Sequence, residues 1–303
     1  MKNKGVQFIL LSAFFFAVMN LFVKLSGDLP SIQKSFFRNL VAAGVAAVIL
    51  IRSDQGIRFQ KKNLPLLILR STLGTIGILC NFYAVDHLVM SDASMLSKLS
   101  PFFVIVFSAV FLKEKADTVQ KLSVAAAFAG SLFIIKPGLQ IDQIVPSLIG
   151  FAGAMAAGSA YTCVRGLSQR GERGPLIVFF FSAFSCLVTL PYLIFSFAPM
   201  TGFQLGSLLL AGVAAACAQF SVTAAYSYAP AKEISVFDYS QVVFSALLGW
   251  IVFGQIPDAL SFVGYAVIIA VAVMLYQHNR KVSGCSLDNP SPGIKERKFG
   301  KIN

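Results

Sequence analysis

The stretch SDASMLSKLSPFFVIVFSAVFLKEKAD, residues 91–117, decides the fold, because its pattern returns downstream as KEISVFDYSQVVFSALLGWIVFGQIPD, residues 232–258. An offset of 141 residues relates the two stretches and places Asp117 on Asp258 (258 − 117 = 141). Further pairs share this offset: Asp92 and Glu233, Ser94 and Ser235, Phe103 and Phe244, Lys24 and Arg165. One unbroken register over most of a chain indicates two copies of one structural unit.

The composition is typical of a membrane-embedded chain. Hydrophobic residues make up 56% of the 303 residues and charged residues only 13%, about half the charged share of globular proteins. The apolar residues fall in runs of about 20, the length that crosses a bilayer core as a helix. They predict ten spans: 6–25, 32–51, 64–84, 93–112, 118–137, 146–165, 175–197, 204–227, 234–253 and 259–277. We therefore expect an all-α integral membrane protein with ten transmembrane helices.

The cations gather on one side of this ten-span arrangement. That side carries Lys2, Lys4, Arg52, Arg58, Lys61, Lys62, Lys113, Lys115, Lys121, Arg165, Arg170, Arg173, Lys232, Arg280, Lys281, Lys295, Arg297, Lys298 and Lys301. The other side has Lys24, Lys34 and Lys136 near its loops. Cytoplasmic loops carry an excess of Lys and Arg, so we expect a multi-pass protein of the cell membrane (a bacterial inner membrane or a plasma membrane) with both termini cytoplasmic. Because the net charge of +12 resides in these loops and in the C-terminal stretch, it does not indicate nucleic-acid binding.

Five spans per unit is an odd number, so the second unit should enter the membrane upside down. The basic loop 52–62 then corresponds to 193–203, which should lie outside and which contains no Lys or Arg. An inverted-topology repeat of this kind is the construction of many secondary transporters. We expect a first five-helix repeat over 1–139, a second, inverted repeat over 140–278, and a flexible cytoplasmic tail over 279–303.

Both halves carry an acid or an amide just after the fourth span, in PFFVIVFSAVFLKEK and DYSQVVFSALLGWIVFGQIPD. With the ten spans in two halves, these motifs resemble the drug/metabolite transporter superfamily, specifically its EamA-type permeases, over about residues 5–277. The resemblance implies a secondary carrier for amino acids, nucleotide-like metabolites, sugar conjugates, vitamins or drugs. Gln255 is equivalent to Glu114 of the first half, and it stands where the second half in this family usually has a glutamate. This departure from the family pattern suggests that residue 255 mainly caps or anchors a helix end.

Charged residues inside apolar spans are expensive, and they mark functional sites by default. Lys98 lies in the fourth span and Asp238 in the ninth, and the offset places Lys98 on Tyr239. We expect Lys98 and Asp238 to form an ion pair near the bilayer midplane. An anionic or amino-acid cargo would open this pair by competing for one of its two charges. The alternative is a permanent pair that only fixes the packing. Asp238 is also the candidate carrier of a coupling proton, which a nearby Lys98 opposes, and exchange without protons is the alternative.

Other polar residues are candidates for lining the pathway. Arg38, in FFRNL, either snorkels to the outer interface or steers an anion at the mouth of a cavity. Tyr161 corresponds to Asn20 by the offset, and positions that differ between the copies are where a symmetric scaffold gains an asymmetric pocket. Tyr161, Tyr239, Asn20 and Asn81 therefore line the pathway or form ordinary interhelical hydrogen bonds.

Three classes of function are consistent with a polytopic membrane chain. The first is a secondary transporter of a small molecule, which works by alternating access around a midplane site. The second is a membrane-embedded enzyme, which two isolated histidines and the lack of an acid-pair motif argue against. The third is a non-transporting receptor or structural subunit, which needs no buried Lys and Asp. We expect no catalytic residues, metal or cofactor, and the absence of GxxxxGK[ST] argues against ATP-driven pumping by this chain.

Reporter fusions test the predicted topology. Fusions after Lys62, Lys115, Arg173 and Arg280 should report a cytoplasmic location, because the basic loops stay inside. Fusions after Met200 and Gln255 should report an external location. A cytoplasmic signal at Gln255 would contradict the inverted repeat.

Overall fold

The computed structural model describes residues 2–53, 60–111, 117–135, 141–228 and 235–288, and all regular structure in this part of the chain is helical. The first half contains α1 (Lys2–Leu25), α2 (Ser31–Ile51), η1 (Lys61–Asn63), α3 (Leu64–His87), α4 (Met90–Ser97), α5 (Ser100–Phe111) and α6 (Thr118–Ile135). The second half contains α7 (Ile141–Gln169), α8 (Gly174–Ser196), α9 (Gly202–Tyr228), η2 (Ser235–Tyr239), α11 (Ser240–Phe253) and α12 (Ala259–Asp288).

The helices are those of a multi-pass membrane protein. Within the described ranges, nine helical segments are long and apolar enough to cross a membrane, with α4 and α5 counted as one. A shorter apolar helix, Phe237–Phe253, lies where the ninth span was predicted. The predicted all-α membrane architecture is thereby confirmed.

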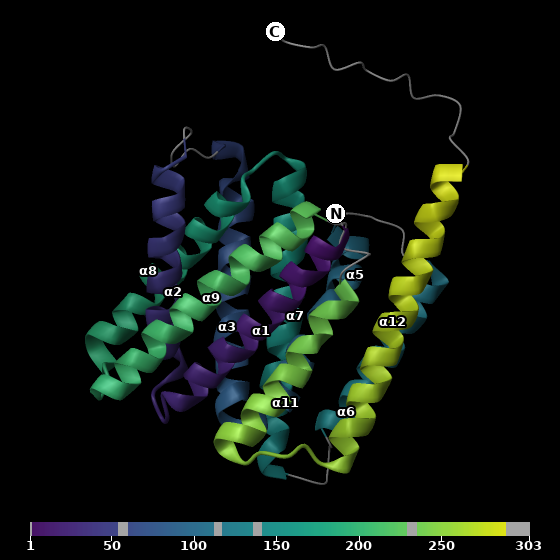
Figure 1. The fold of residues 1–303 in the computed structure, drawn as a ribbon. Coiled ribbons are helices and arrows are strands. Elements are labelled where there is room, and N and C mark those ends of the chain that lie inside the picture. Colours follow the sequence, from purple (N-terminus) through teal and green to yellow (C-terminus); the bar gives the residue numbers. More distant parts are fainter. Residues whose placement is uncertain (1, 54–59, 112–116, 136–140, 229–234, 289–303) are drawn as a thin grey trace.

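The ends of the described chain lie at the same end of the bundle, where α1 begins and α12 ends (Figure 1); we call it the terminal end. α12 continues to Asp288, ten residues past the predicted boundary at 278. The first proline after α12 is Pro290, and the residue before a proline is disfavoured in a helix. The predicted tail therefore begins as a continuation of α12, and residues 289–303 lie outside the described residues.

Helix packing follows the symmetry of the repeat. The offset of 141 residues relates α1 to α7, α2 to α8 and α3 to α9. α1 packs on α9 and α3 packs on α7. The first helix of each half therefore packs on the third helix of the other half. α2 packs on α8 and α6 on α12, and each of these pairs joins equivalent elements. α4 packs on α11, and these two helices belong to the fourth span of the first half and of the second half. This arrangement is expected of two units related by a two-fold pseudo-axis, as in inverted-repeat carriers.

The fourth span of each half departs from regular α-helix at equivalent positions, which we call the interruptions. α4 ends at Ser97, and α5 begins at Ser100 with Pro101 in its first turn, where a missing backbone N–H costs nothing. In the second half η2 ends at Tyr239 and α11 begins at Ser240. The offset places Lys98 on Tyr239, so both interruptions fall at the same place in the repeat.

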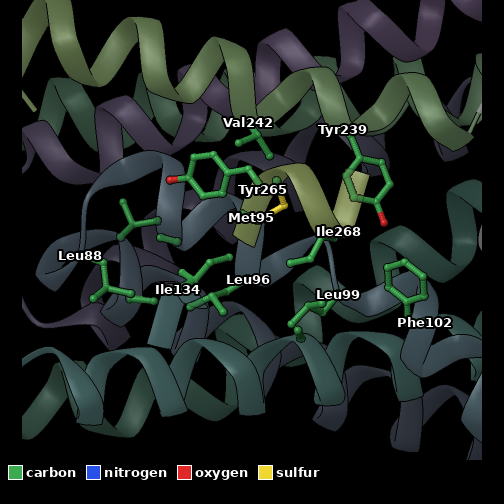
Figure 2. Close-up of a cluster of buried hydrophobic side chains, with 14 of the residues drawn as sticks. Leu88, Met95, Leu96, Leu99, Phe102, Ile134, Tyr239, Val242, Tyr265 and Ile268 are labelled. Atoms are coloured by element: carbon green, nitrogen blue, oxygen red, sulfur yellow. The ribbon is translucent and has the colours of Figure 1, made fainter. Parts of the chain in front are cut away.

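Apolar packing surrounds the first interruption. Met95, Leu96 and Leu99 are fully buried and pack in one cluster with Ile134 of α6 and Ile268 of α12 (Figure 2). Figure 2 also shows the rings of Tyr239 and Tyr265 entering this cluster. Both interruptions therefore contribute to one core.

Equivalent aspartates begin the fifth helix of each half. Asp117 Oδ1 accepts a hydrogen bond from the Gln120 N–H at 2.8 Å before α6, and Asp258 Oδ1 accepts one from the Ser261 N–H at 2.8 Å before α12. Such side chains satisfy the first, otherwise unpaired, N–H groups of a helix. The Gln120 amide, followed by the His278 side chain, holds the pKa of the Asp117 carboxyl below its usual value. The sequence match of Asp117 with Asp258 thus reflects a shared helix-capping role.

Gly158 tests the close approach of α5 and α7. A Cβ at this position would lie 2.8 Å from the Ser100 carbonyl oxygen and 2.5 Å from Phe103 Cβ. Gly158→Ala should therefore force the helices apart and destabilise the protein by about 1–3 kcal/mol, measured by thermal unfolding in detergent. Gly44→Ala is the matched control, because a Cβ at Gly44 meets no atom within 4 Å. Equal unfolding temperatures for the two variants would contradict this account of the packing.

Candidate functional site

Lys98 and Asp238 form an ion pair at the two interruptions. Lys98 Nζ lies 2.6 Å from Asp238 Oδ2, and the two side chains are 9% and 25% exposed. This contact joins the fourth helix of one half to the ninth span in the other. The predicted pairing of Lys98 with Asp238 is therefore present in the structure.

Helix ends stabilise both charges. Lys98 directly follows α4, and its backbone N–H donates to the carbonyls of Ser94 and Met95. Asp238 lies two residues before the start of α11. A cation is favoured at a helix C-terminus and an anion at an N-terminus. The interrupted helices thus place each charge where a helix dipole favours it.

Tyr239 connects the same two interruptions through its hydroxyl. Tyr239 is buried, and its Oη donates a hydrogen bond to the Lys98 carbonyl oxygen at 3.1 Å. Lys98 and Tyr239 are equivalent residues of the two halves, and under a two-fold relation equivalent residues meet only near the axis. The ion pair therefore lies close to the pseudo-axis that relates the two repeats.

Asn20 and Asn81 belong to a buried chain of hydrogen bonds between helices. Asn81 Nδ2 donates to Asn20 Oδ1 at 3.5 Å, and Asn20 Nδ2 donates to Ser94 Oγ at 3.4 Å. Ser94 Oγ in turn lies 2.7 Å from Ser245 Oγ. This chain links α3, α1, α4 and α11, which is the interhelical hydrogen bonding expected as the alternative to pathway lining.

Arg38 does not snorkel to an interface. It is 3% exposed, and its Nη1 donates to Asn39 Oδ1 at 2.6 Å. Asn39 is itself oriented by donating to Ser35 Oγ at 3.1 Å and to Ser185 Oγ at 3.0 Å. The packing of α2 on α8 thus holds the guanidinium inside the bundle, which removes the interfacial explanation for Arg38.

Tyr161 belongs to the same region of the protein as Arg38 and Asp238. It is within electrostatic range of Arg38, Arg70 and Asp238, and it is 49% exposed. This placement supports the interpretation that Tyr161 lines a pathway. We call Arg38, Arg70, Lys98, Tyr161 and Asp238 the central site.

Arg70 was not among the site residues predicted from the sequence. This residue of α3 is 8% exposed, and its guanidinium carbon lies 3.9 Å from the centre of the Phe181 ring. The signal was present, because Arg70 is the seventh residue of the apolar run that begins at Leu64. A rule that flags every cation inside a predicted span would have included it.

A second buried ion pair lies at the opposite end of the bundle. Lys34 Nζ is 2.6 Å from Asp86 Oδ1, and the Lys34 side chain is fully buried. Lys24 Nζ donates to the carbonyl oxygens of Val85 at 2.9 Å and Leu88 at 2.6 Å. The sequence placed Lys24 and Lys34 near outer loops and missed these contacts, which tie α1 and α2 to the end of α3.

Gln255 anchors a helix end, as its departure from the family pattern suggested. Gln255 Oε1 accepts a hydrogen bond from the Met90 N–H at 3.2 Å, at the first residue of α4. The end of α11 is thereby joined to the start of α4. Glu114, the acid that the resemblance marks in the first half, lies outside the described residues.

Comparison with known proteins assigns both halves to the same family. A sequence model of the EamA-like transporter family matches residues 3–136 and 145–277, once in each repeat. A solved crystal structure superposes with a TM-score of 0.65 at 15% identity, over 91% of this chain and 98% of the other. That likeness concerns the fold.

Characterised relatives are transporters by name. The chain is 34% identical over 275 residues to the pseudopaline exporter CntI of Pseudomonas aeruginosa, covering 90% of this chain and 96% of that protein. It is 27% identical to the riboflavin transporter of Brucella anthropi, with coverage of 88% and 96%. It is also 27% identical to human solute carrier family 35 member G1, with coverage of 84% and 73%.

The role of Gln255 can be tested with two substitutions of similar size. Gln255→Glu keeps an acceptor for the Met90 N–H and adds a negative charge at a helix N-terminus, worth about 0.3–1 kcal/mol. This variant should unfold at the wild-type temperature or above it. Gln255→Met removes the acceptor and should cost about 1 kcal/mol, measured by thermal unfolding in detergent. A Gln255→Met protein as stable as wild type would show that the contact is dispensable.

Proposed function

Because the chain belongs to the EamA-like transporter family, we propose that it is a secondary carrier, and not an enzyme, for a small organic metabolite. In this proposal the two halves rock about the pseudo-axis, so that the central site opens alternately to each side of the membrane. The cargo classes are those of the family: an amino acid, a nucleotide-like compound, a vitamin or a drug. The excess of cations on the terminal end supports a cytoplasmic location for that end.

The contact between Lys98 and Tyr239 carries this proposal. Equivalent positions of two inverted units meet there, beside an ion pair formed by one residue from each half. Rocking the halves about their axis would change the distances between these residues more than it would change any contact within one half. Cargo that competes for Lys98 or Asp238 would therefore couple its binding to the relative position of the halves.

Partial exposure of Asp238 supports exchange with cargo. The Asp238 side chain is 25% exposed, whereas Lys98 is nearly buried. A pair that opens needs access for the competing group, and the exposure of Asp238 provides it. The same access would let a proton reach Asp238. Transport assays at different pH would therefore distinguish proton coupling from exchange without protons.

Substitution of the pair separates a transport role from a packing role. Lys98→Met and Asp238→Asn should each abolish counterflow in proteoliposomes while the protein still inserts and purifies. If the pair is purely structural, each single variant leaves a buried charge unpaired and loses about 3–5 kcal/mol. The counterflow panel should include amino acids, nucleosides, riboflavin, pseudopaline and cationic drugs.

The double variant and a matched ion pair complete this test. The Lys98→Met/Asp238→Asn protein should be stable and inactive. The matched control is Lys34→Met/Asp86→Asn, which removes a buried pair with the same 2.6 Å separation away from the central site. The control should retain counterflow. Wild-type flux in the Lys98→Met/Asp238→Asn protein would mean that this pair only holds helices together.

A further inference from the structure

The central site contains two buried arginines that lack an acidic partner. Among the described residues, neither the Arg38 nor the Arg70 guanidinium forms an ion pair with a carboxylate. Arg38 Nε, Arg70 Nε and Arg70 Nη1 are buried and have no hydrogen-bond partner. Buried charges are ordinarily paired or hydrogen-bonded. These N–H groups are therefore donors that the protein itself leaves unused.

The guanidinium of Arg70 is held in a defined place. It stacks on the Phe181 ring of α8 at 3.9 Å, a favourable cation–π arrangement. Gly74, one turn further along α3, leaves the space that the guanidinium occupies, because a Cβ there would collide with Arg70 Nη1 and lie 2.9 Å from the Phe181 ring. The asparagine contact described above fixes Arg38 in a similar way. Both donors are thus positioned before any ligand arrives.

The scaffold does not require these two charges. The offset of 141 residues places Arg38 on Phe179 and Arg70 on Ala211, so the second unit carries neither charge at the equivalent positions. A role in the general fold would be expected in both copies. The two arginines occur in one half only. Positions that differ between the halves are where a carrier with a symmetric scaffold forms an asymmetric binding site.

The charge of the central site favours an anion. Arg38 and Arg70 are within electrostatic range of each other and of Tyr161. Lys98 and Asp238 neutralise each other, so two positive charges remain. Like charges held close together in a poorly hydrated interior repel, and an anion between them removes that cost. Guanidinium groups bind carboxylate and phosphate oxygens with matched, often bidentate, hydrogen bonds.

We propose that Arg38 and Arg70 bind an oxyanionic group of the cargo, a carboxylate or a phosphate, near Tyr161. This inference rests on the proposed function, because it assigns the chemistry of the cargo at that carrier's central site. It narrows the candidate cargoes to organic anions and zwitterions that present such a group.

Ligand-induced stabilisation of the purified full-length protein tests the proposal. The probes are glutarate, benzoate and inorganic phosphate, with the uncharged glutaramide and benzamide as matched controls and sodium chloride at equal ionic strength. A ligand that binds the folded state raises the unfolding temperature in a saturable way. At least one oxyanion should do so, and its amide should not. Carboxylates and phosphate are separate arms, so the responding arm identifies the group.

Four variants test whether the two arginines form the oxyanion-binding site. Arg38→Met and Arg70→Met should each raise the apparent dissociation constant of the responding oxyanion at least tenfold. Gly74→Ala should weaken binding through displacement of the Arg70 guanidinium with the charge retained. Arg52→Met is the matched control, because Arg52 lies exposed at the end of α2, and it should bind like wild type. If a core variant fails to fold, the acid-against-amide comparison on wild type still decides whether an oxyanion binds.

Several results would overturn the inference. One is a wild-type protein that responds to no oxyanion beyond sodium chloride, and another is binding that survives in both arginine variants. Counterflow of a neutral compound at the wild-type rate in both variants would refute this cargo chemistry and leave the carrier intact. Selective oxyanion binding without counterflow of any compound would instead refute the proposed function alone.

Discussion

The structure depends on one contact, in which the interrupted helices of two inverted units meet at their shared axis. Tyr239 donates to the carbonyl of its own counterpart, Lys98, and Lys98 pairs with Asp238 beside it. An interruption leaves backbone groups and charges inside the membrane, where each unsatisfied group is costly. Each unit supplies the partner for the other. The two halves therefore stabilise one another at the place about which the proposed transport cycle would move them.

The repeat also accounts for matching contacts at the two ends of the bundle. At the opposite end, Gln204 Nε2 donates to the Ser26 carbonyl at 3.1 Å. At the terminal end, Gln60 contacts the loop of Arg170 and Glu172, with its N–H 2.9 Å from Glu172 Oε1. The loop of Gln60 is equivalent to the loop of Gln204, and the loop of Ser26 is equivalent to the loop of Arg170 and Glu172. The two ends therefore carry the same contact between equivalent loops of the two halves. A rocking motion about the axis would strain one contact while it relaxes the other.

The sequence predicted the architecture because hydrophobic length and a constant offset are properties of the backbone scaffold. It also predicted the Lys98–Asp238 pair, since two lone charges near one axis have few other partners. It could not place Tyr161 or exclude snorkelling by Arg38, because both depend on helix rotation, which the packing of α2, α7 and α8 determines. The Lys34–Asp86 pair was missed because both residues lie near the ends of apolar runs, where loops and spans look alike. Arg70 lies inside a predicted span, so its sequence signal was present and was overlooked.

Paired spin-label distances test most directly whether the axial contact governs both ends of the molecule. One pair, at Asp28 and Thr201, spans the loop contact at the opposite end, and a second, at Arg52 and Arg170, spans that at the terminal end. Both pairs are measured in wild type and in the Lys98→Met/Asp238→Asn protein. The account predicts that loss of the ion pair shifts the two distance distributions in opposite directions. Unchanged distributions, or shifts of the same sign at both ends, would contradict it.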